Sequence, residues 1–218
     1  MEQNKIPHIA LDIETLSLRP TATITAIAAK TFFFNGTTDE DNSLTLCVDA
    51  TSCAMYNLTS DQQTVTWWAN QPLEAKTFFL NEPAVKLREA LLRLRILYLQ
   101  VQQDYNYKPV KVWVQGSDYD IAILRNAYRS VFEDSEDSIP WAHNCVRDAR
   151  TYILSNLNLL ASVGFFDGFD PAYNPERPYD ILPRMTGWVK HNADSDVRQM
   201  IHNLHHVTNF MLEAFRHD

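Results

Sequence analysis

The chain has 218 residues, 45% of them hydrophobic, which is enough for one sizeable core of an ordinary globular protein. No apolar run is long enough to cross a membrane, the first residues carry no signal-peptide pattern, and three scattered cysteines favour a reduced protein over a disulfide scaffold. The net charge of −8 excludes a broad basic surface for duplex nucleic acid, but not a narrow pocket for a polyanion. We therefore expect a single cytoplasmic domain over residues 1–218, with no membrane contact.

The first part of the chain predicts a meander of three strands. Residues 8–13 (HIALDI) form a short apolar run typical of a buried strand. Residues 23–34 are rich in Thr, Ile, Ala and Phe, and the Asn35-Gly36 pair that follows is a strong hairpin signal. Residues 44–48 then predict a third strand.

The rest of the chain alternates between helical and strand patterns. A helix over 60–71 has Ser60 or Asp61 as its N-cap and Pro72 at its end. The remaining predictions are helices over 83–102, 119–131, 148–160 and 193–216, strands over 111–115 and 141–146, and a loop near a site over 164–184. This order predicts an α/β fold with a mixed β-sheet flanked by helices.

Two carboxylates lie at the end of the first predicted strand. Asp12 and Glu14 are two residues apart, so strand alternation places both side chains on one face. In so apolar a strand, two carboxylates on one face need a compensating partner, which a divalent metal supplies. The alternative is a strand end where both acids simply meet water.

Two further acids and a histidine stand near predicted helix starts. Asp120 follows a strand and a glycine, where a helix cap is the alternative, and Asp118 competes for either role. Asp196 lies in the first turn of the last helix, where an acid also favours the helix dipole, and His191 precedes that turn.

The joint pattern of four carboxylates and one imidazole suggests two divalent metals and a water-activating base. Oxygen ligands without cysteine suit Mg²⁺ or Mn²⁺, and two such ions about 3.5–4 Å apart stabilise the attacking and leaving oxygens of an in-line displacement. Histidine titrates in a range that suits a base for the attacking water. The pattern therefore indicates cleavage of phosphodiesters.

At these residues the chain resembles the DEDDh exonucleases of the ribonuclease H-like (DnaQ-like) superfamily. The motif D-x-E-T matches Asp12-Ile-Glu14-Thr15, the second motif matches Tyr119-Asp120, and H-x4-D matches His191 and Asp196. Residues 64–71 (TVTWWANQ) and 147–151 (RDART) are similar to a narrower family that contains phage exodeoxyribonuclease A and a mycobacterial 3′–5′ exoribonuclease. The similar segments span residue 8 to about 210.

The resemblance implies a ribonuclease H-like fold, two Mg²⁺ or Mn²⁺ ions, and removal of nucleotides from the 3′ ends of single-stranded DNA or RNA. It carries Asp12, Glu14, Asp120 and Asp196 over as metal ligands and His191 as general base. It leaves a homodimer open. Leu16-Ser17 and Tyr119 depart from the residues usual at those places in the superfamily, which puts the shape of the nucleotide pocket in question. Thr15 and Leu16, at the end of the first motif, are expected to bind substrate.

Several other residues are candidates for substrate binding. Trp67 and Trp68 point about 100° apart on a helix, so we expect one in the core. The other is a candidate for stacking on a terminal base, with a core position for both tryptophans as the alternative. Arg147 and Arg150 are candidates for holding phosphate, with a structural Asp–Arg pair as the alternative.

The histidines of the last helix, the alternative functions and the sugar of the substrate complete the predictions. His202, His205 and His206 in the last helix are expected to be surface or packing residues. A catalytically silent nucleic-acid-binding or protein-interaction module of the same fold is the alternative to a 3′–5′ exonuclease, and an endonuclease is a third possibility. The sugar of the substrate is not readable from the sequence, because no residue is identifiable as the reader of a 2′-hydroxyl.

Overall fold

The computed structural model describes residues 6–133, 138–166 and 181–216. In this part of the chain, a five-stranded sheet has the order β3-β2-β1-β4-β5. Its strands are β1 His8–Thr15, β2 Ile24–Phe32, β3 Thr38–Cys47, β4 Lys111–Val114 and β5 Val146–Asp148. The first three strands pair antiparallel as a meander, whereas β4 and β5 are parallel to β1. The predicted α/β fold with a mixed sheet is confirmed.

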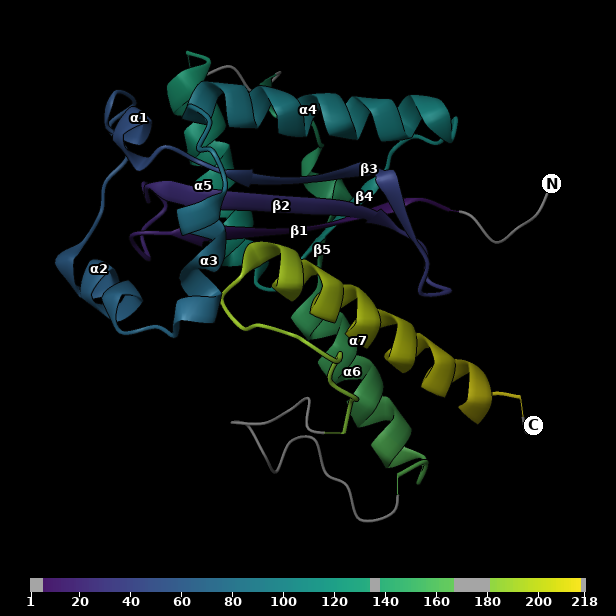
Figure 1. Ribbon diagram of the computed structural model, residues 1–218. Helices are drawn as coiled ribbons and strands as arrows, with labels where there is room; N and C mark the ends of the chain where they lie inside the picture. The colour runs from purple at the N-terminus through teal and green to yellow at the C-terminus, as the bar shows by residue number, and fades with distance from the viewer. Residues whose placement is uncertain (1–5, 134–137, 167–180, 217–218) are drawn as a thin grey trace.

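Helices cover both faces of the sheet (Figure 1). The helices are α1 Ala50–Ala54, α2 Gln62–Ala69, α3 Leu73–Asn81, α4 Leu87–Asp104, α5 Ser117–Val131, α6 Ala149–Ser162 and α7 Ala193–Ala214. The buried residues of α4 and α5 form one core with the sheet, and those of α6 and α7 form a second core on the other face. Helix α2 stands beyond the end of the sheet, and its Trp67 ring packs against His191, which precedes α7.

The two faces of the central strand are easily distinguished. Ile9, Leu11 and Ile13 of β1 belong to the core beneath α4 and α5, and Ala10 belongs to the core beneath α7. Small residues on the second face let α7 approach the sheet closely, which brings the first turn of α7 near the carboxyl end of β1.

Two predictions in the middle and second half of the chain are wrong. The strand predicted over 141–146 is absent except at Val146, where β5 begins. Trp141 packs its ring against Tyr98 and Tyr128, and a short 3₁₀ helix, His143–Cys145, leads into β5. A short apolar run does not show whether the segment is a strand of a sheet or only packs against the core. The helix predicted to begin at residue 83 begins at Leu87, since Val85 forms an isolated bridge with Val48.

The third strand begins at residue 38 rather than 44. Its first half, TDEDNS, lies at the edge of the sheet and is largely exposed, so no apolar pattern reveals it. Helices α1 and α3 were not predicted. Most of the predicted loop over 164–184 falls on residues 167–180, outside the described part of the chain. Within that part, no helix is both long and apolar enough to span a bilayer.

Candidate active site

The first two acids project from the carboxyl end of β1. Asp12 and Glu14 have the same alternation as Ala10, so both point to the face that α7 covers, as predicted. Asp12 is partly buried, and Glu14 is only 9% exposed. Strand β1 therefore presents two poorly hydrated carboxylates to the first turn of α7.

Asp196 and His191 reach the same place from the start of α7. Asp196 Oδ2 accepts a 2.8 Å hydrogen bond from the His191 backbone N–H, and Oδ1 accepts another of 2.8 Å from Trp188 Nε1. Asn192 caps the helix by accepting from the Ser195 N–H. His191 has a φ of 64°, a left-handed conformation that costs a non-glycine residue free energy and is common at functional sites. The loop is thus folded back onto Asp196.

Three of the carboxylates converge. One oxygen each from Asp12, Glu14 and Asp196 lies within 4.8 Å of the others. Burial first, and then the neighbouring acids, raise the pKa of Asp12 well above its ordinary value and the pKa of Glu14 to about 8. Crowding and burial therefore favour protonated carboxyls when no cation is bound, and the group offers oxygen ligands alone, which is the donor set that hard divalent cations prefer. These residues fit a metal ion.

Asp120 is the fourth acid of the site. It is 4% exposed and lines the same cavity, although it lies outside the three-residue convergence. Burial raises its pKa to about 7. Helix α5 begins after Gly116, so Asp120 is not its N-cap, and Asp118 is exposed. Of the two aspartates, Asp120 is the one that lines the cavity.

The imidazole of His191 stands at the edge of this acidic group. Burial, and then the charge of Lys190, hold its pKa below the usual histidine range, so the ring is neutral near pH 7. The Trp67 ring packs edge-on against it, with 4.7 Å between centroids. A neutral imidazole beside a metal-capable group is able to accept a proton from water.

The two tryptophans of α2 divide as expected. Trp68 is buried, 8% exposed, and its Nε1 donates a 2.8 Å hydrogen bond to the carbonyl of Thr15. Trp67 is 41% exposed and lines the cavity. The Thr15 hydroxyl is 2.5 Å from the Tyr119 hydroxyl. Thr15 is thus fixed on both its side chain and its carbonyl, and it anchors the end of β1 to α2 and α5.

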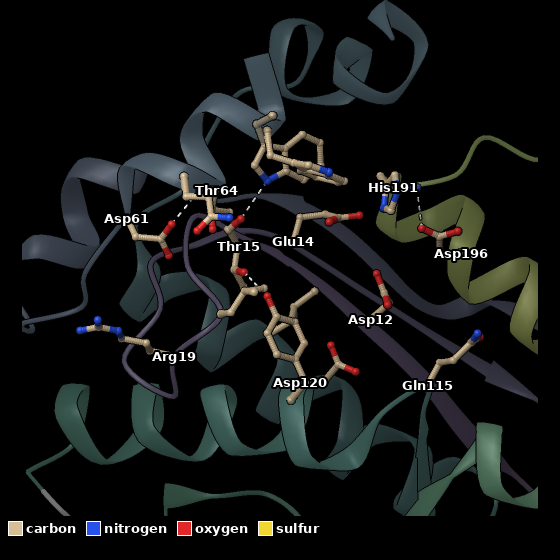
Figure 2. Close-up of a pocket in the computed structure, with 16 residues that line it drawn as sticks. Asp12, Glu14, Thr15, Arg19, Asp61, Thr64, Gln115, Asp120, His191 and Asp196 are labelled. Atoms are coloured by element: carbon tan, nitrogen blue, oxygen red, sulfur yellow. Dashed lines mark hydrogen bonds between the residues drawn. The ribbon is translucent and has the colours of Figure 1, made fainter. Parts of the chain in front are cut away.

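All of these groups open into one cavity of about 700 Å³. Figure 2 shows His191, Asp12 and Asp196 at one end and Arg19 and Asp61 at the other. We call the first the acidic end; its residues are Asp12, Glu14, Asp120, His191 and Asp196. We call the second the polar end; its residues are Arg19, Asp61 and Thr64, and Leu18 and Gln63 also line the cavity.

Sequence reasoning missed the polar end, apart from Asp61 as a helix cap. Asp61 accepts from the Thr64 N–H at 2.7 Å and so caps α2. Arg19 is exposed and forms no ion pair among the described residues. One signal was available: the connection that follows β1 must leave from the same edge of the sheet as Asp12 and Glu14, and Arg19 lies in it.

Three residues predicted to bind substrate lie outside the lining of the cavity. The Leu16 N–H donates to the Thr23 carbonyl at 2.9 Å. Arg147 donates to backbone carbonyls of its own segment, and Arg150 donates to the Gln115 carbonyl at 3.2 Å. Their role in substrate binding stays a prediction.

Asp148 orients backbone rather than an arginine. Its carboxylate caps α6 by accepting from the Thr151 N–H at 2.8 Å and also accepts from the Ser117 N–H at 2.7 Å. It therefore ties the first turns of α5 and α6 together.

The histidines of α7 pack among themselves. The His202 and His206 rings have centroids 4.3 Å apart, and His205 Nδ1 lies 3.0 Å from the Phe34 carbonyl oxygen. They belong to no metal-capable group among the described residues.

Comparison with known proteins places the chain in a family. The model of the 3′–5′ exoribonuclease Rv2179c-like domain matches residues 7–164. None of the curated proteins matches the sequence.

Three solved structures to which the chain is similar are nucleases. Exonuclease I of E. coli, in complex with a dT13 oligonucleotide, superposes with a TM-score of 0.63 at 13% identity over 98% of this chain and 43% of that chain. The cell-death related nuclease CRN-4 has a TM-score of 0.54 at 14% identity over 93% and 64%. Exonuclease I of Methylocaldum szegediense has a TM-score of 0.55 at 14% identity over 95% and 43%.

The chain therefore spans less than half the length of the exonuclease I proteins that it matches. At these identities the likeness shows the fold, and the predicted ribonuclease H-like fold is confirmed.

Proposed function

The chain belongs to the 3′–5′ exoribonuclease Rv2179c-like domain family, and from this membership we propose that it is a metal-dependent 3′–5′ exonuclease of single-stranded nucleic acid. It hydrolyses the phosphodiester next to the 3′ end and releases nucleoside 5′-monophosphates. Residues 1–218 act as one exonuclease domain in this proposal.

One observation supports it beyond the family match: Asp196, which binds the backbone of His191, converges with Asp12 and Glu14. The family match ends at residue 164, before either Asp196 or His191. Nevertheless, the fold brings an Asp196 oxygen within 4.8 Å of oxygens from both β1 acids, and Asp196 holds the His191 backbone. Because about 180 residues of chain separate these groups, their convergence on one cavity supports a reaction centre.

Asp12, Glu14 and Asp196 hold the metal, with Asp120 beside them, and two Mg²⁺ or Mn²⁺ ions are the proposed complement. When bound, such ions stabilise negative charge on the attacking and leaving oxygens of a phosphodiester. Binding requires the raised-pKa carboxyls to lose their protons, so we expect metal affinity to rise with pH.

His191 is the proposed general base. It takes a proton from the water that attacks phosphorus, while the bond from phosphorus to the 3′ oxygen of the preceding nucleotide breaks. The lowered pKa keeps the ring neutral and ready to accept that proton. Its backbone bond to Asp196 keeps the imidazole beside the acidic group.

The rest of the cavity is the proposed seat of the terminal nucleotide. A volume of about 700 Å³ is within the range of small-ligand sites, which suits the end of a single strand. The exposed face of Trp67 is a platform on which a base can stack, and Arg19 offers a cation for a phosphate. Exonuclease I bound to dT13 shows that the shared fold accommodates a single strand in that protein.

Location and assembly are also parts of the proposal. All three cysteines are free and buried, which supports a cytoplasmic protein. A homodimer stays a prediction, which light scattering on the purified protein tests.

The test is digestion of 5′-labelled single strands of RNA and DNA of equal sequence, with Mn²⁺ and with Mg²⁺. We expect a ladder that shortens from the 3′ end, with nucleoside 5′-monophosphates as the product on chromatography. The family description names RNA, and the preferred sugar is read from the faster ladder. Binding of both strands without any product would indicate the silent module instead.

A further inference from the structure

A buried lysine lies between the sheet and α7. Lys30 of β2 is 3% exposed and stands between Ala28 and Phe32, on the face that packs against α7. An ammonium group in such a place is costly unless charged partners compensate it. Its Nζ lies 3.2 Å from Glu40 Oε2 and 3.2 Å from Asp194 Oδ1. The lysine thus links an edge strand to the first turn of α7.

Asp194 is the centre of this group. Besides Lys30, it accepts a 2.9 Å hydrogen bond from the Thr45 hydroxyl and one of 2.8 Å from Arg198 Nε. Two cations and two anions from β2, β3 and α7 balance one another, since Glu40 is the fourth member. Directional contacts of this kind fix the position of α7 along the sheet, which apolar packing alone does loosely.

The tie acts next to the proposed metal ligands. Asp194 lies two residues before Asp196 in the same helical turn. Asp196 in turn holds the backbone of His191. Whatever fixes the first turn of α7 therefore fixes both groups relative to β1.

The acidic end supplies a force that such a tie must resist. Asp12 and Glu14 belong to β1, whereas Asp196 is carried by α7, and their oxygens lie within 4.8 Å. When these carboxylates are ionised and no cation is bound, they repel one another, and the repulsion drives the first turn of α7 away from the sheet. Lys30 attracts the same turn toward the sheet.

We propose that Lys30 is a positioning residue, which holds the first turn of α7 against β2 so that Asp196 stays close enough to Asp12 and Glu14 to share a divalent cation. This inference rests on the proposed function, because it assumes that these three acids bind a metal. Lys30 itself touches neither the cation nor the substrate.

The experiment is a calorimetric titration of Mn²⁺ into the whole chain and into Lys30→Met, which keeps an unbranched side chain of nearly the same length and removes its charge. We expect the Mn²⁺ dissociation constant to rise about 10–100-fold, as for other residues that orient metal ligands, with the same number of ions bound. At saturating Mn²⁺, the kcat of Lys30→Met stays within about twofold of the unaltered chain, because the cation itself then holds the acids together.

A second test variant and a control variant accompany Lys30→Met. Asp194→Asn removes the negative charge at the centre of the tie, and we expect the same loss of Mn²⁺ affinity even if Lys30→Met folds poorly. Arg93→Met removes an exposed cation, paired with Glu89 on α4, and we expect it to leave the affinity unchanged.

The outcomes separate the inference from the function. Unchanged Mn²⁺ affinity in both Lys30→Met and Asp194→Asn overturns the inference, and so does a kcat that stays low at saturating Mn²⁺. Mn²⁺ binding that weakens in both variants supports it. A chain that binds Mn²⁺ in this lysine-dependent way, yet shortens no strand, overturns the exonuclease assignment and leaves the tie in place.

Discussion

The two ends of the cavity are built on opposite principles. The acidic end takes side chains from β1, α5 and the start of α7, buries most of them and forces like charges together. The polar end takes side chains from the connection after β1 and from α2, and leaves Arg19 exposed. The carboxylates of the acidic end need a bound cation to act in catalysis. The hydrated side chains of the polar end need no such partner and contribute to substrate binding. Substitutions at the two ends should therefore differ in size and in the kinetic constant that they change.

The largest effect is expected at the acidic end itself. Asp12→Asn removes charge from the centre of the metal-capable group while keeping its shape. Because bound ions provide several kcal/mol of transition-state stabilisation, we expect kcat to fall by about 10³-fold or more. Single-turnover digestion measures it, with circular dichroism as the check on folding.

Two neighbouring aspartates of α5 test whether activity requires the buried acids of the acidic end. Asp120→Asn should approach the loss of Asp12→Asn, and the exposed Asp118→Asn should keep nearly full activity. Equal activity in both variants would remove Asp120 from the site.

The next effect is the loss of the base. His191→Asn suits the left-handed backbone that His191 adopts, because asparagine tolerates it better than most residues. We expect kcat to fall by about 10²–10³-fold with Mn²⁺ affinity unchanged. The pH–rate profile is the specific readout: activity of the unaltered chain rises with pH as His191 loses its proton, below the usual histidine range, and the variant lacks that limb. A limb that survives in the variant would assign it to another group.

A smaller effect is expected where the two ends meet. Trp67→Ala removes the exposed ring that contacts His191. Stacking contributes about 1–3 kcal/mol per base, so we expect KM to rise about 5- to 150-fold, with kcat changed less. Val65→Ala, at an exposed position on the same helix, is the control and should leave KM unchanged. A purely structural role for Trp67 would lower the melting temperature and leave KM alone.

The polar end predicts a weaker response. Arg19→Gln removes an exposed cation whose contact with phosphate is screened by water, so we expect about 0.2–1 kcal/mol, or up to about fivefold in KM. The difference should shrink as salt is raised. Arg93→Gln on α4 is the matched surface control. An effect on kcat of the size seen for Asp12→Asn would contradict the division of the cavity into two ends.

The smallest expected effect is on the stability of the metal-free protein. The folded chain holds protons on Glu14 and Asp120 up to pKa values of about 8 and 7, against ordinary values of 4.5 and 3.8. Above the ordinary values the unfolded chain binds fewer protons than the folded one, so stability falls as pH rises toward 8. In chelator, we expect the melting temperature to drop by a few degrees between pH 5 and 8, and less in Glu14→Gln. A melting temperature that rises over this range would refute the raised pKa values.

The sequence predicted the acidic end better than the polar end, for a physical reason. Strand alternation predicts that Asp12 and Glu14, two residues apart, point to the same face. The predicted start of the last helix places Asp196 in its first turn, close to His191. Exposed residues such as Arg19 and Gln63 follow no hydrophobic pattern in the sequence. Only the folded structure shows that they line the cavity.

The same contrast appears in the fold. Buried strands and long helices were predicted, whereas the polar edge half of β3 and the short helix α1 left no apolar pattern to read. The tie at Lys30 was equally invisible, because its partners Glu40 and Asp194 are far apart in the chain.

The most direct test of the central claim compares a 5′-labelled linear strand with the same strand closed into a circle, each incubated in Mn²⁺ with the unaltered chain and with Asp12→Asn. The account predicts that the unaltered chain shortens the linear strand one nucleotide at a time from its 3′ end and leaves the circle intact. Asp12→Asn should leave both strands intact. Cutting of the circle would show an endonuclease, and equal digestion by Asp12→Asn would show that the acidic end is not the reaction centre.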